Sequence, residues 1–438
     1  MAAVRERLMR AAVRRALCIA AAPALFAASD VAAQSLDAAQ EDTPDLFTRS
    51  RGVAVHERPQ PAYDAIGLKA GGFTLWPDLR VQTTHDDNVF AAERAPQAAI
   101  VVRLTPQIAA RSDWGRHGLE GHARLDIDRN LDFDSENVVD ARLGASARLD
   151  VNRGAWVTAG ADYAHAHDPR TAAGVDATTA RPVAYDLTSA RLEAVRTAGR
   201  LRLSARAEAA RIDYRDGVNA AGGAVEQDDR DRTVLTLGGR ADYAVSPGLS
   251  VFVQMAGDER DHRRIAGRPS RTSSGGQILA GMDFERGGLM RGEIAAGYLR
   301  QDYRDAAFGD IDGFGGRARV SWFVTPLTTI VVTAGRSVED AAVVGASGAL
   351  RTEAAFAADH ELLRNLILSA RLTRTRDVYD GLSRIDERSG LGVGADYRMN
   401  RRYGVVADLT WLDQSSSGAA AGPNYRSTRI SIAAVGRF

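Results

Sequence analysis

The feature that most constrains the fold of this chain is an alternation of apolar and polar side chains with a period of two. Residues 100–111 show it plainly, with one apolar face and one largely polar face. The apolar face is Ile100, Val102, Leu104, Pro106, Ile108 and Ala110, and the other is Val101, Arg103, Thr105, Gln107, Ala109 and Arg111. Because successive side chains of a β-strand point to opposite faces, this pattern predicts a strand with unlike surroundings on its two sides.

The alternation returns from about residue 72 to the end of the chain. Residues 119–128, 141–151, 249–258 and 366–373 repeat it. The predicted strands run for about 12 to 16 residues, well beyond the roughly five or six that are usual in globular sheets. A tilted strand that crosses a bilayer needs about 9–11 residues, and outer-membrane strands project further. No segment after residue 33 is apolar enough for a transmembrane helix, so we expect any membrane crossing to use strands.

We expect the apolar positions to contact lipid and the polar positions to face a wet lumen. The expected lipid contacts are Leu104, Leu125, Leu149 and Val253. The expected lumen-facing residues are Arg103, Glu120, Arg124, Asp126, Asp128, Arg142, Arg148 and Asp150, together with Gln254. Because both signs of charge occur on this face, we expect weak ion selectivity.

Two kinds of connection separate the predicted strands. Short ones lie near Asp113–His117, Asn152–Gly154, Thr197–Arg200, Ser246–Gly248, Arg286–Gly288, Thr325–Pro326, Leu363–Asn365 and Met399–Arg402. Long polar ones lie near 86–97, 168–183, 215–229, 259–271, 304–310, 339–349, 379–385 and 413–425. Tight turns on one side and long loops on the other are typical of outer-membrane barrels.

These observations predict an all-β fold, a transmembrane antiparallel β-barrel with short periplasmic turns and longer extracellular loops. The eight short turns join sixteen strands, and one further strand at each end brings the count to about eighteen, with sixteen left open. Closure follows from physics, because lipid offers no hydrogen bonds to the unpaired backbone groups of an open sheet edge.

The N-terminus predicts export. Five arginines between Arg5 and Arg15 precede an apolar run from Ala16 to Ala28, and Val31-Ala32-Ala33 supplies a cleavage site before Gln34. This is the layout of a signal peptide. We therefore divide the chain into a signal peptide (1–33), a periplasmic N-terminal extension (34–71) and the barrel (72–438), and we expect it in the outer membrane of a Gram-negative bacterium.

Composition excludes several classes of function. Cys18 is the single cysteine and lies in the predicted signal peptide, so we expect no disulfide, thiol catalysis or cysteine–metal site in the mature chain. The full chain has 56 basic and 56 acidic residues, and residues 1–33 contain five of the basic and two of the acidic ones. The mature chain therefore keeps 51 basic and 54 acidic residues, a net charge of −3. Near-neutrality argues against a nucleic-acid partner.

The last strand carries a candidate assembly signal. Ile430, Ile432, Ala434, Gly436 and Phe438 alternate with polar or small residues, and Phe438 is the terminal residue. An aromatic residue that ends an alternating strand resembles the signal read by the outer-membrane assembly machinery. We therefore expect that machinery, together with outer-membrane lipid and lipopolysaccharide, among the partners of the chain.

Several segments resemble one known family. They are 58–67, 72–79 with Trp76 and Pro77, Asp86–Phe90, Ser112–His117, Gly297–Tyr303 and Thr325–Ile330. Over about residues 55–438 the chain resembles the putative β-barrel porin 2 family of outer-membrane proteins. It departs from the family pattern at Ala62, Ala65 and Gly72. The resemblance implies a porin, in some relatives a link to exopolysaccharide synthesis and export, and no catalytic residues.

Three polar groups could hold a metal ion, and each also has a structural interpretation. His165, His167 and Asp168 stand at the end of a strand, where polar residues also begin an external loop. Asp126, Asp128, Asp132 and Asp134 alternate, and Asp310-Ile311-Asp312-Gly313 has a faint likeness to a calcium loop, but neither has the ligand spacing of one. External carboxylates could also bind Ca²⁺ or Mg²⁺ that bridges lipopolysaccharide. Asp86-Asp87-Asn88 suits a turn.

Passive transport is the function that we expect: an aqueous pore for small polar solutes or a glycan, without a cofactor. A structural or assembly barrel with a plugged lumen, associated with exopolysaccharide, is the alternative. A barrel enzyme is a third hypothesis, although no G-x-S-x-G, P-loop, H-E-x-x-H or dinucleotide-binding motif occurs.

Overall fold

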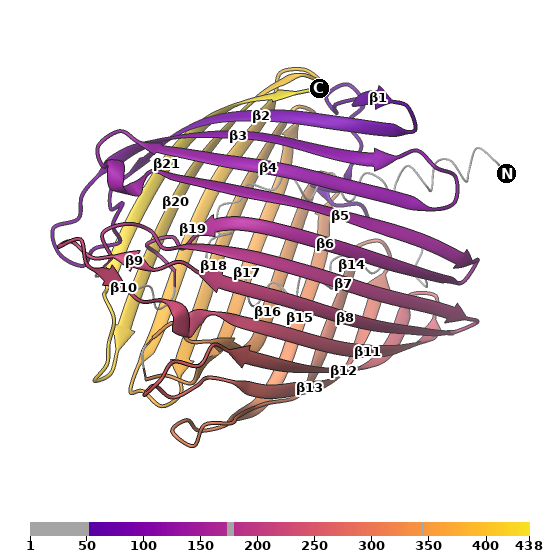
Figure 1. Ribbon diagram of the computed structural model, residues 1–438. Coiled ribbons are helices and arrows are strands. Elements are labelled where there is room, and N and C mark those ends of the chain that lie inside the picture. Colours follow the sequence, from indigo (N-terminus) through magenta and orange to yellow (C-terminus); the bar gives the residue numbers. More distant parts are fainter. Residues whose placement is uncertain (1–51, 173–178, 344) are drawn as a thin grey trace.

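The computed structural model describes residues 52–172, 179–343 and 345–438, and within them the chain forms a closed antiparallel β-barrel (Figure 1). The predicted signal peptide lies outside the described residues. The eighteen barrel strands are β2(Phe73–Asp86), β3(Ala99–Ser112), β4(Gly118–Asn130), β5(Val138–Asn152), β6(Ala155–His167), β7(Ala184–Ala198), β8(Leu201–Tyr214), β11(Arg232–Ser246), β12(Leu249–His262), β13(Ser273–Arg286), β14(Met290–Tyr303), β15(Ile311–Thr325), β16(Thr328–Asp340), β17(Gly348–Leu363), β18(Leu366–Tyr379), β19(Ile385–Arg398), β20(Tyr403–Ser417) and β21(Tyr425–Arg437).

The barrel closes between its first and last strands. β2 pairs with β3 on one side and with β21 on the other, where Asp78 lies opposite Arg437 and Asp86 opposite Arg429. Every other barrel strand pairs with its neighbours in the chain. The predicted fold class and the count of eighteen are therefore confirmed, and the strands have 13 to 16 residues.

Small elements decorate this barrel. A short strand, β1(Leu68–Ala70), adds to the start of β2. A two-residue hairpin forms in one long loop from β9(Gly217–Val218) and β10(Ala224–Val225). The three 3-10 turns of the described residues are η2(Val55–Glu57), η3(Asp134–Glu136) and η4(Asp228–Arg230). No helix in the described part of the chain is long and apolar enough to cross a membrane.

The connections separate by length, as expected. All eight short turns occur, with two to five residues each, at the end of the barrel where β2 starts and β21 stops. The opposite, extracellular end carries nine loops, one more than the eight long connections read from the sequence. The additional loop is 131–137, which contains η3. This loop was not predicted, because it is short and its Leu131 and Phe133 continue the apolar–polar alternation of the flanking strands.

The outer surface is an apolar band with aromatic side chains near both ends of the strands. The exposed aromatic residues near the periplasmic ends are Tyr243, Trp322, Tyr397, Tyr403 and Phe438. Those nearer the extracellular ends are Tyr163, Tyr298, Phe314 and Trp411. Girdles of aromatic residues at the two membrane interfaces are a property of outer-membrane barrels.

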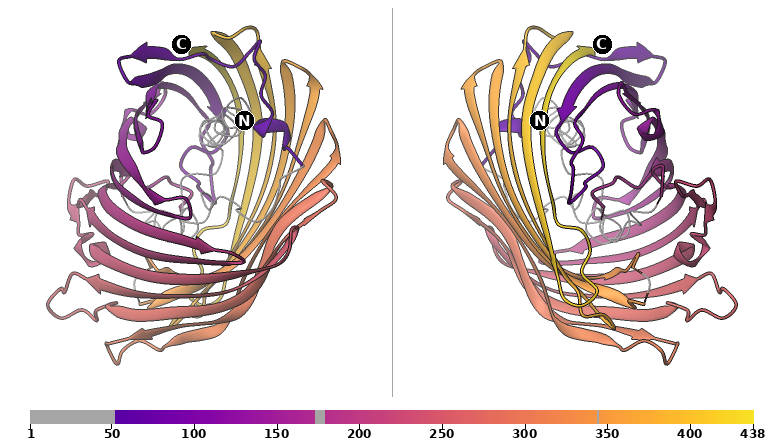
Figure 2. Two further views of the ribbon diagram at one scale, coloured as in Figure 1. Left: turned by 90° about the vertical axis from the view of Figure 1, so that its right-hand side faces the viewer. Right: turned by 90° about the vertical axis from the view of Figure 1, so that its left-hand side faces the viewer.

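The barrel is folded sharply along β12–β15, a region that we call the crease. Figure 2 shows the walls formed by β2–β8 and by β17–β21 facing each other and converging toward it. Glycines on the inner face allow the strands to approach. A Cβ added to Gly297 would lie 1.9 Å from the carbonyl oxygen of Ile278, and one added to Gly281 would lie 2.6 Å from the Phe252 ring. Phe252, Leu279 and Ala295 form a small buried core in this narrow part.

Candidate solute pathway

The wall formed by β3 and β4 carries charged pairs on its inner face. Arg103 donates two hydrogen bonds of 2.5 Å to the carboxylate of Asp128. Arg124 donates hydrogen bonds of 2.7 and 2.8 Å to Asp126, which also accepts one from the Thr105 hydroxyl at 2.8 Å. Four of the residues expected in the lumen thus form two neighbouring ion pairs.

Of the remaining residues expected in the lumen, Gln254 lies on β12 and the others lie nearby on β4 and β5. Arg148 donates to Asp150 at 2.9 Å, and its guanidinium lies 4.5 Å from the centre of the Trp156 ring. Glu120 lies 3.4 Å from Arg111 of β3. Arg142 lies directly opposite Arg124 in the β4–β5 ladder, so two like charges are neighbours there.

The crease is filled by a polar network around Phe252. Arg240 of β11 lies with its guanidinium 3.5 Å from the centre of the Phe252 ring, and it donates to Glu293 at 2.8 Å and to Asp283 at 2.7 Å. Arg317 of β15 donates to Glu293 at 2.6 Å and to Gln254 at 2.8 Å. Contacts from β11 to β14 and from β15 to β12 skip intervening strands, so the two sides of the crease meet inside the barrel.

A second network joins the two sides at the extracellular end, and we call it the clasp. Arg260 of β12 donates to Asp340 of β16 at 2.9 Å and to the backbone oxygen of Val338 at 3.0 Å. Arg232 of β11 lies 2.7 Å from the other oxygen of Asp340. These three charged side chains are almost completely buried. The clasp therefore holds β11 and β12 against β16.

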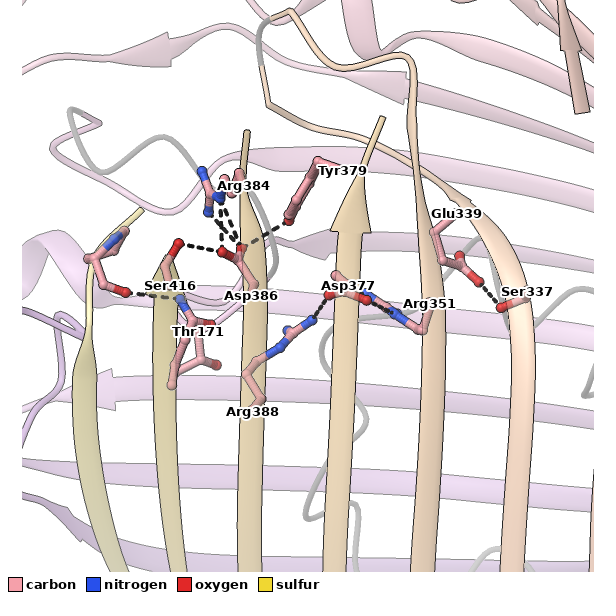
Figure 3. A network of polar contacts seen from close by, with 12 residues as sticks. Thr171, Ser337, Glu339, Arg351, Asp377, Tyr379, Arg384, Asp386, Arg388 and Ser416 are labelled. Carbon is pink, nitrogen blue, oxygen red and sulfur yellow. Dashed lines mark hydrogen bonds and ion pairs between the residues drawn. The ribbon is translucent and has the colours of Figure 1, made fainter. Parts of the chain in front are cut away.

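A third network lies on the inner face of β17–β20, near their extracellular ends (Figure 3). Asp377 accepts hydrogen bonds from Arg351 at 2.7 Å and from Arg388 at 2.5 Å, so one buried carboxylate serves two arginines. One step further out, Asp386 accepts from Arg384, from the Tyr379 hydroxyl at 3.1 Å and from the Ser416 hydroxyl at 2.5 Å. This network stiffens the wall that faces β3–β5.

Residues 168–172, the described start of the loop that connects β6 with β7, reach toward β21 at the extracellular mouth. The Tyr425 hydroxyl of β21 donates to the backbone oxygen of Thr171 at 3.2 Å, although four strands (β2–β5) lie between β6 and β21 around the barrel. Arg170 of the same loop donates to Glu136 at 2.6 Å, and Asp168 accepts from Arg230 at 2.6 Å. These contacts hold the loop over the lumen.

A small cavity lies where this loop meets the opposite wall. Its volume is about 170 Å³. The lining residues include Phe90, Arg170, Arg384, Gln414 and Tyr425. Because both arginines already bind carboxylates, the cavity has little free charge to offer a ligand.

The periplasmic mouth is narrowed by residues 52–66, which precede the barrel. Val55 is buried, and its N–H donates to the Thr329 hydroxyl at 3.1 Å. Arg58 donates to Glu361 at 3.0 Å, and His56 lies 3.1 Å from Asp359. Thr329, Asp359 and Glu361 are inner-face residues at the periplasmic ends of β16 and β17. The segment therefore crosses the inner surface at that end, which its aperiodic sequence did not indicate.

Titratable groups outside the membrane-spanning strands are held by local hydrogen bonds. The backbone N–H groups of Ser270 and Ala307 donate to Asp305 and keep the pKa of its carboxyl below the usual range. At the periplasmic end, hydrogen bonds from Lys69 and Thr74 lower the pKa of Asp113. Asp305 thus joins two neighbouring extracellular loops, and Asp113 fastens β1 to the first periplasmic turn.

The sequence motifs considered for metal binding have other partners. The His165 and His167 rings lie 5.4 Å apart, but His165 contacts Asp186 and His167 contacts Asp140. Asp168 binds Arg230 instead. Asp310 accepts from the backbone of Tyr303, and Asp312 accepts from the Tyr298 hydroxyl. Asp126 and Asp128 form the ion pairs described above. Asp132 accepts a hydrogen bond from the Ile100 N–H, and Asp134 accepts one from the Asn137 side chain. Asp86 caps Asn88 in a turn, as expected. Among the described residues, no group of three or more His, Cys, Asp or Glu is arranged to hold a metal ion.

The C-terminal residues lie on the outer surface near the periplasmic rim. Ile430, Ile432 and Phe438 are exposed, and the Phe438 N–H donates to the backbone oxygen of Pro77 at 3.1 Å. Ala434 and Gly436 share their face of β21, and a Cβ added to Gly436 would lie 4.0 Å from the Phe438 ring. Recognition of this strand by the assembly machinery stays a prediction.

Two inner-face features were missed by the sequence reading. Phe252 stands at an inward position between Ser250 and Gln254, and the reading of that segment passed over it. A large apolar residue on the polar face is a signal that the face packs against protein there. The ion pair between Arg260 and Asp340 was the second, because the two residues are 80 positions apart and no local sequence pattern indicates that they meet.

Solved outer-membrane proteins resemble the chain in outline. The outer membrane protein OpdK from Pseudomonas aeruginosa is 13% identical, the match covers 83% of this chain and 99% of that chain, and the TM-score is 0.44. OccAB2 from Acinetobacter baumannii is 13% identical over 84% and 98%, with a TM-score of 0.45. The ferric enterobactin receptor PfeA from P. aeruginosa is 6% identical over 83% and 80%, with a TM-score of 0.44.

Comparison by sequence gives a family. No curated protein matches the chain. The family model described as putative beta-barrel porin 2 matches residues 60–438, which include the whole barrel. The fold is that of an outer-membrane β-barrel, and the resemblance noted in the sequence is confirmed. The chain therefore belongs to the putative beta-barrel porin 2 family.

Proposed function

We propose that the barrel gives passive passage to small polar solutes through the space between the walls formed by β2–β8 and by β17–β21. The observation that carries this proposal is a contrast in the exposure of charged side chains. His122 and Arg191 on the first wall are 53% and 43% exposed, whereas Arg240 in the crease is 13% exposed. Exposed charges on an inward face need water around them, so the hydrated space lies away from the crease.

The solutes expected to pass are polar and carry little net charge. Asp162 on the first wall lies 3.1 Å from Arg191 and 3.6 Å from His122, and the Arg103–Asp128 and Arg124–Asp126 pairs continue this mixture of signs. Paired charges orient dipolar solutes without repelling either sign of ion. Weak ion selectivity is therefore the expected behaviour.

The two ends of the pathway set the size limit. At the extracellular mouth residues 168–172 reach to Tyr425, and at the periplasmic mouth residues 52–66 cross the inner surface. Both segments are held by specific hydrogen bonds, so the openings have defined edges. Solutes larger than a small sugar are expected to be excluded unless one of these segments moves.

A second candidate is a barrel with a closed lumen that serves in the assembly of the cell envelope. The segment 52–66 at the periplasmic mouth favours it, because a constriction at that end limits flow. The proposed link to exopolysaccharide rests on family resemblance alone. Of the two candidates, open passage accounts for the exposed inward charges, and closure does not.

Single-channel recording tests the proposal. The refolded full-length mature protein, placed in a planar bilayer, is expected to give discrete conductance steps and a reversal potential near zero in a salt gradient. Liposome swelling is expected with small neutral sugars. Arg191→Ala on the inner wall should alter the step size, and Arg211→Ala on the outer surface should not. A folded barrel that stays electrically silent and admits no sugar would overturn open passage and favour closure.

A further inference from the structure

Four arginines gather on the outer surface of the barrel, and we call them the rim patch: Arg336, Arg374, Arg376 and Arg426. They lie on β16, β18, β18 and β21, each within five residues of the extracellular end of its strand. Arg374, Arg376 and Arg426 are exposed, by 53%, 51% and 79%. All four alternate with inward residues such as Asp377 and Ser427, so their side chains belong to the outer face.

The strand register makes these residues one continuous surface. Thr352 of β17 lies opposite both Arg336 and Arg376. In the neighbouring row, Arg374 lies opposite Ser389, which lies opposite Asp413, which lies opposite Arg426. Because adjacent strands are about 4.8 Å apart, Arg336 and Arg376 are separated by roughly 10 Å. Small hydroxyl side chains between the arginines leave room for a polar headgroup.

The rim patch stands next to an apolar row on the side of the bilayer core. Phe356, Leu372, Leu391 and Trp411 lie opposite one another along β17–β20, and all four are exposed. Side chains of this kind contact acyl chains, and an exposed Trp marks the interface. The arginines are therefore placed at the level of the lipid headgroups in the outer leaflet.

The charge of the patch is positive by two. Four arginines face two carboxylates: Glu387 pairs with Arg374 and Arg376, and Asp413 pairs with Arg426 at 2.6 Å. Within the described part of the chain, the buried Nε atom of Arg336 has no hydrogen-bond partner. Two outward arginines elsewhere on the rim each pair with one carboxylate, Arg211 with Asp213 and Arg304 with Glu259.

We propose that the rim patch is a binding site for the phosphate groups of lipopolysaccharide. Guanidinium groups bind phosphate through two parallel hydrogen bonds, and a partly dehydrated interface strengthens such pairs. The lipid would place its phosphorylated sugars against the arginines and hydroxyls and its acyl chains on the apolar row. This surface is separate from the lumen, so the site does not depend on the proposed transport function.

The test compares two lipids on one set of variants. Full-length mature protein, refolded in detergent, is titrated with diphosphorylated lipid A and with its dephosphorylated form, in the presence of EDTA. The double variant Arg374→Ala/Arg376→Ala and the single variant Arg336→Ala probe the patch. The matched control, Arg211→Ala/Arg304→Ala, removes two outward arginines elsewhere on the rim. Resistance to denaturing detergent in unheated gels checks that each barrel is folded.

The proposal expects the wild type and the control to bind diphosphorylated lipid A, and the double variant to bind it about tenfold more weakly, as loss of charge-assisted hydrogen bonds requires. Binding of the dephosphorylated lipid should be weak and the same in all variants. Equal affinity of variant and wild type would overturn the site. Equal loss in the control would show unspecific attraction. Loss of wild-type binding in EDTA would show that bridging cations hold the lipid. Full competition by millimolar inorganic phosphate would show a site for free phosphate. Either outcome would contradict direct binding of the lipid.

Discussion

Removal of the Asp340 carboxylate is expected to weaken the barrel at its crease. Asp340 is the shared partner of Arg260 and Arg232, and the side chains of all three are 10% exposed or less. Asp340→Ala would leave Arg232 without its carboxylate and Arg260 with Asp258 alone, which lies 2.8 Å away. Breaking a buried ion pair by removing one partner costs about 3–5 kcal/mol. Because Arg260 keeps Asp258, we expect about 3 kcal/mol.

The assay is equilibrium unfolding of the detergent-refolded barrel in urea, followed by tryptophan fluorescence. The matched control is Asp213→Ala, whose partner Arg211 is 72% exposed. Loss of such a surface pair costs at most about 1 kcal/mol. Asp340→Ala should therefore lower the free energy of unfolding clearly more than Asp213→Ala does.

A third variant separates charge from packing. In Asp340→Leu combined with Arg232→Met, Arg260 keeps Asp258 as its partner, so none of these buried charges is left unpaired; apolar replacement of a buried ion pair is often neutral or stabilising. Much of the lost stability should return. If Asp340→Ala were no less stable than Asp213→Ala, the clasp would not hold the crease, and the argument that places the water on the opposite side would fail.

Three further outcomes are expected from the same structure. Leu125→Arg puts a charge on the lipid-facing side of β4 and should impair assembly by about 2–4 kcal/mol, whereas Asp126→Arg on the inner side should mainly change selectivity; equal yields of folded protein would contradict the facing. Deletion of Phe438 should lower the amount of barrel in the outer membrane, above all at high expression. The barrels that do insert should keep near-normal heat resistance, because a rim phenylalanine contributes only about 1–3 kcal/mol to the fold. If the deletion variant reached the outer membrane in wild-type amounts, Phe438 would have no role in assembly. Val55→Asp places a charge where the segment 52–66 is buried, and it should release the segment and raise single-channel conductance. An unchanged conductance would show that this segment does not limit flow.

The strands and their number could be predicted from the amino-acid sequence because both are local properties. Alternation such as that of residues 100–111 arises when one side of a strand meets lipid and the other meets water, and a chain must encode it residue by residue. Short turns such as Asn152–Gly154 are marked by their own residues. The loop 131–137 was not predicted because its first residues, Leu131-Asp132-Phe133-Asp134, continue the alternation of the strand before it.

The shape of the lumen was decided only by the tertiary structure. Arg240 and Arg103 are both inward arginines on alternating strands, and nothing in their neighbourhoods of sequence tells them apart. Arg240 is buried in the crease with Glu293, 53 positions away, whereas the side chain of Arg103 is 38% exposed. The same holds for Val55, whose partner Thr329 is 274 positions distant. Period-two patterning specifies which face a side chain takes, but the curvature of a closed sheet decides what that face meets, and curvature depends on contacts between strands that the chain brings together only after it has closed.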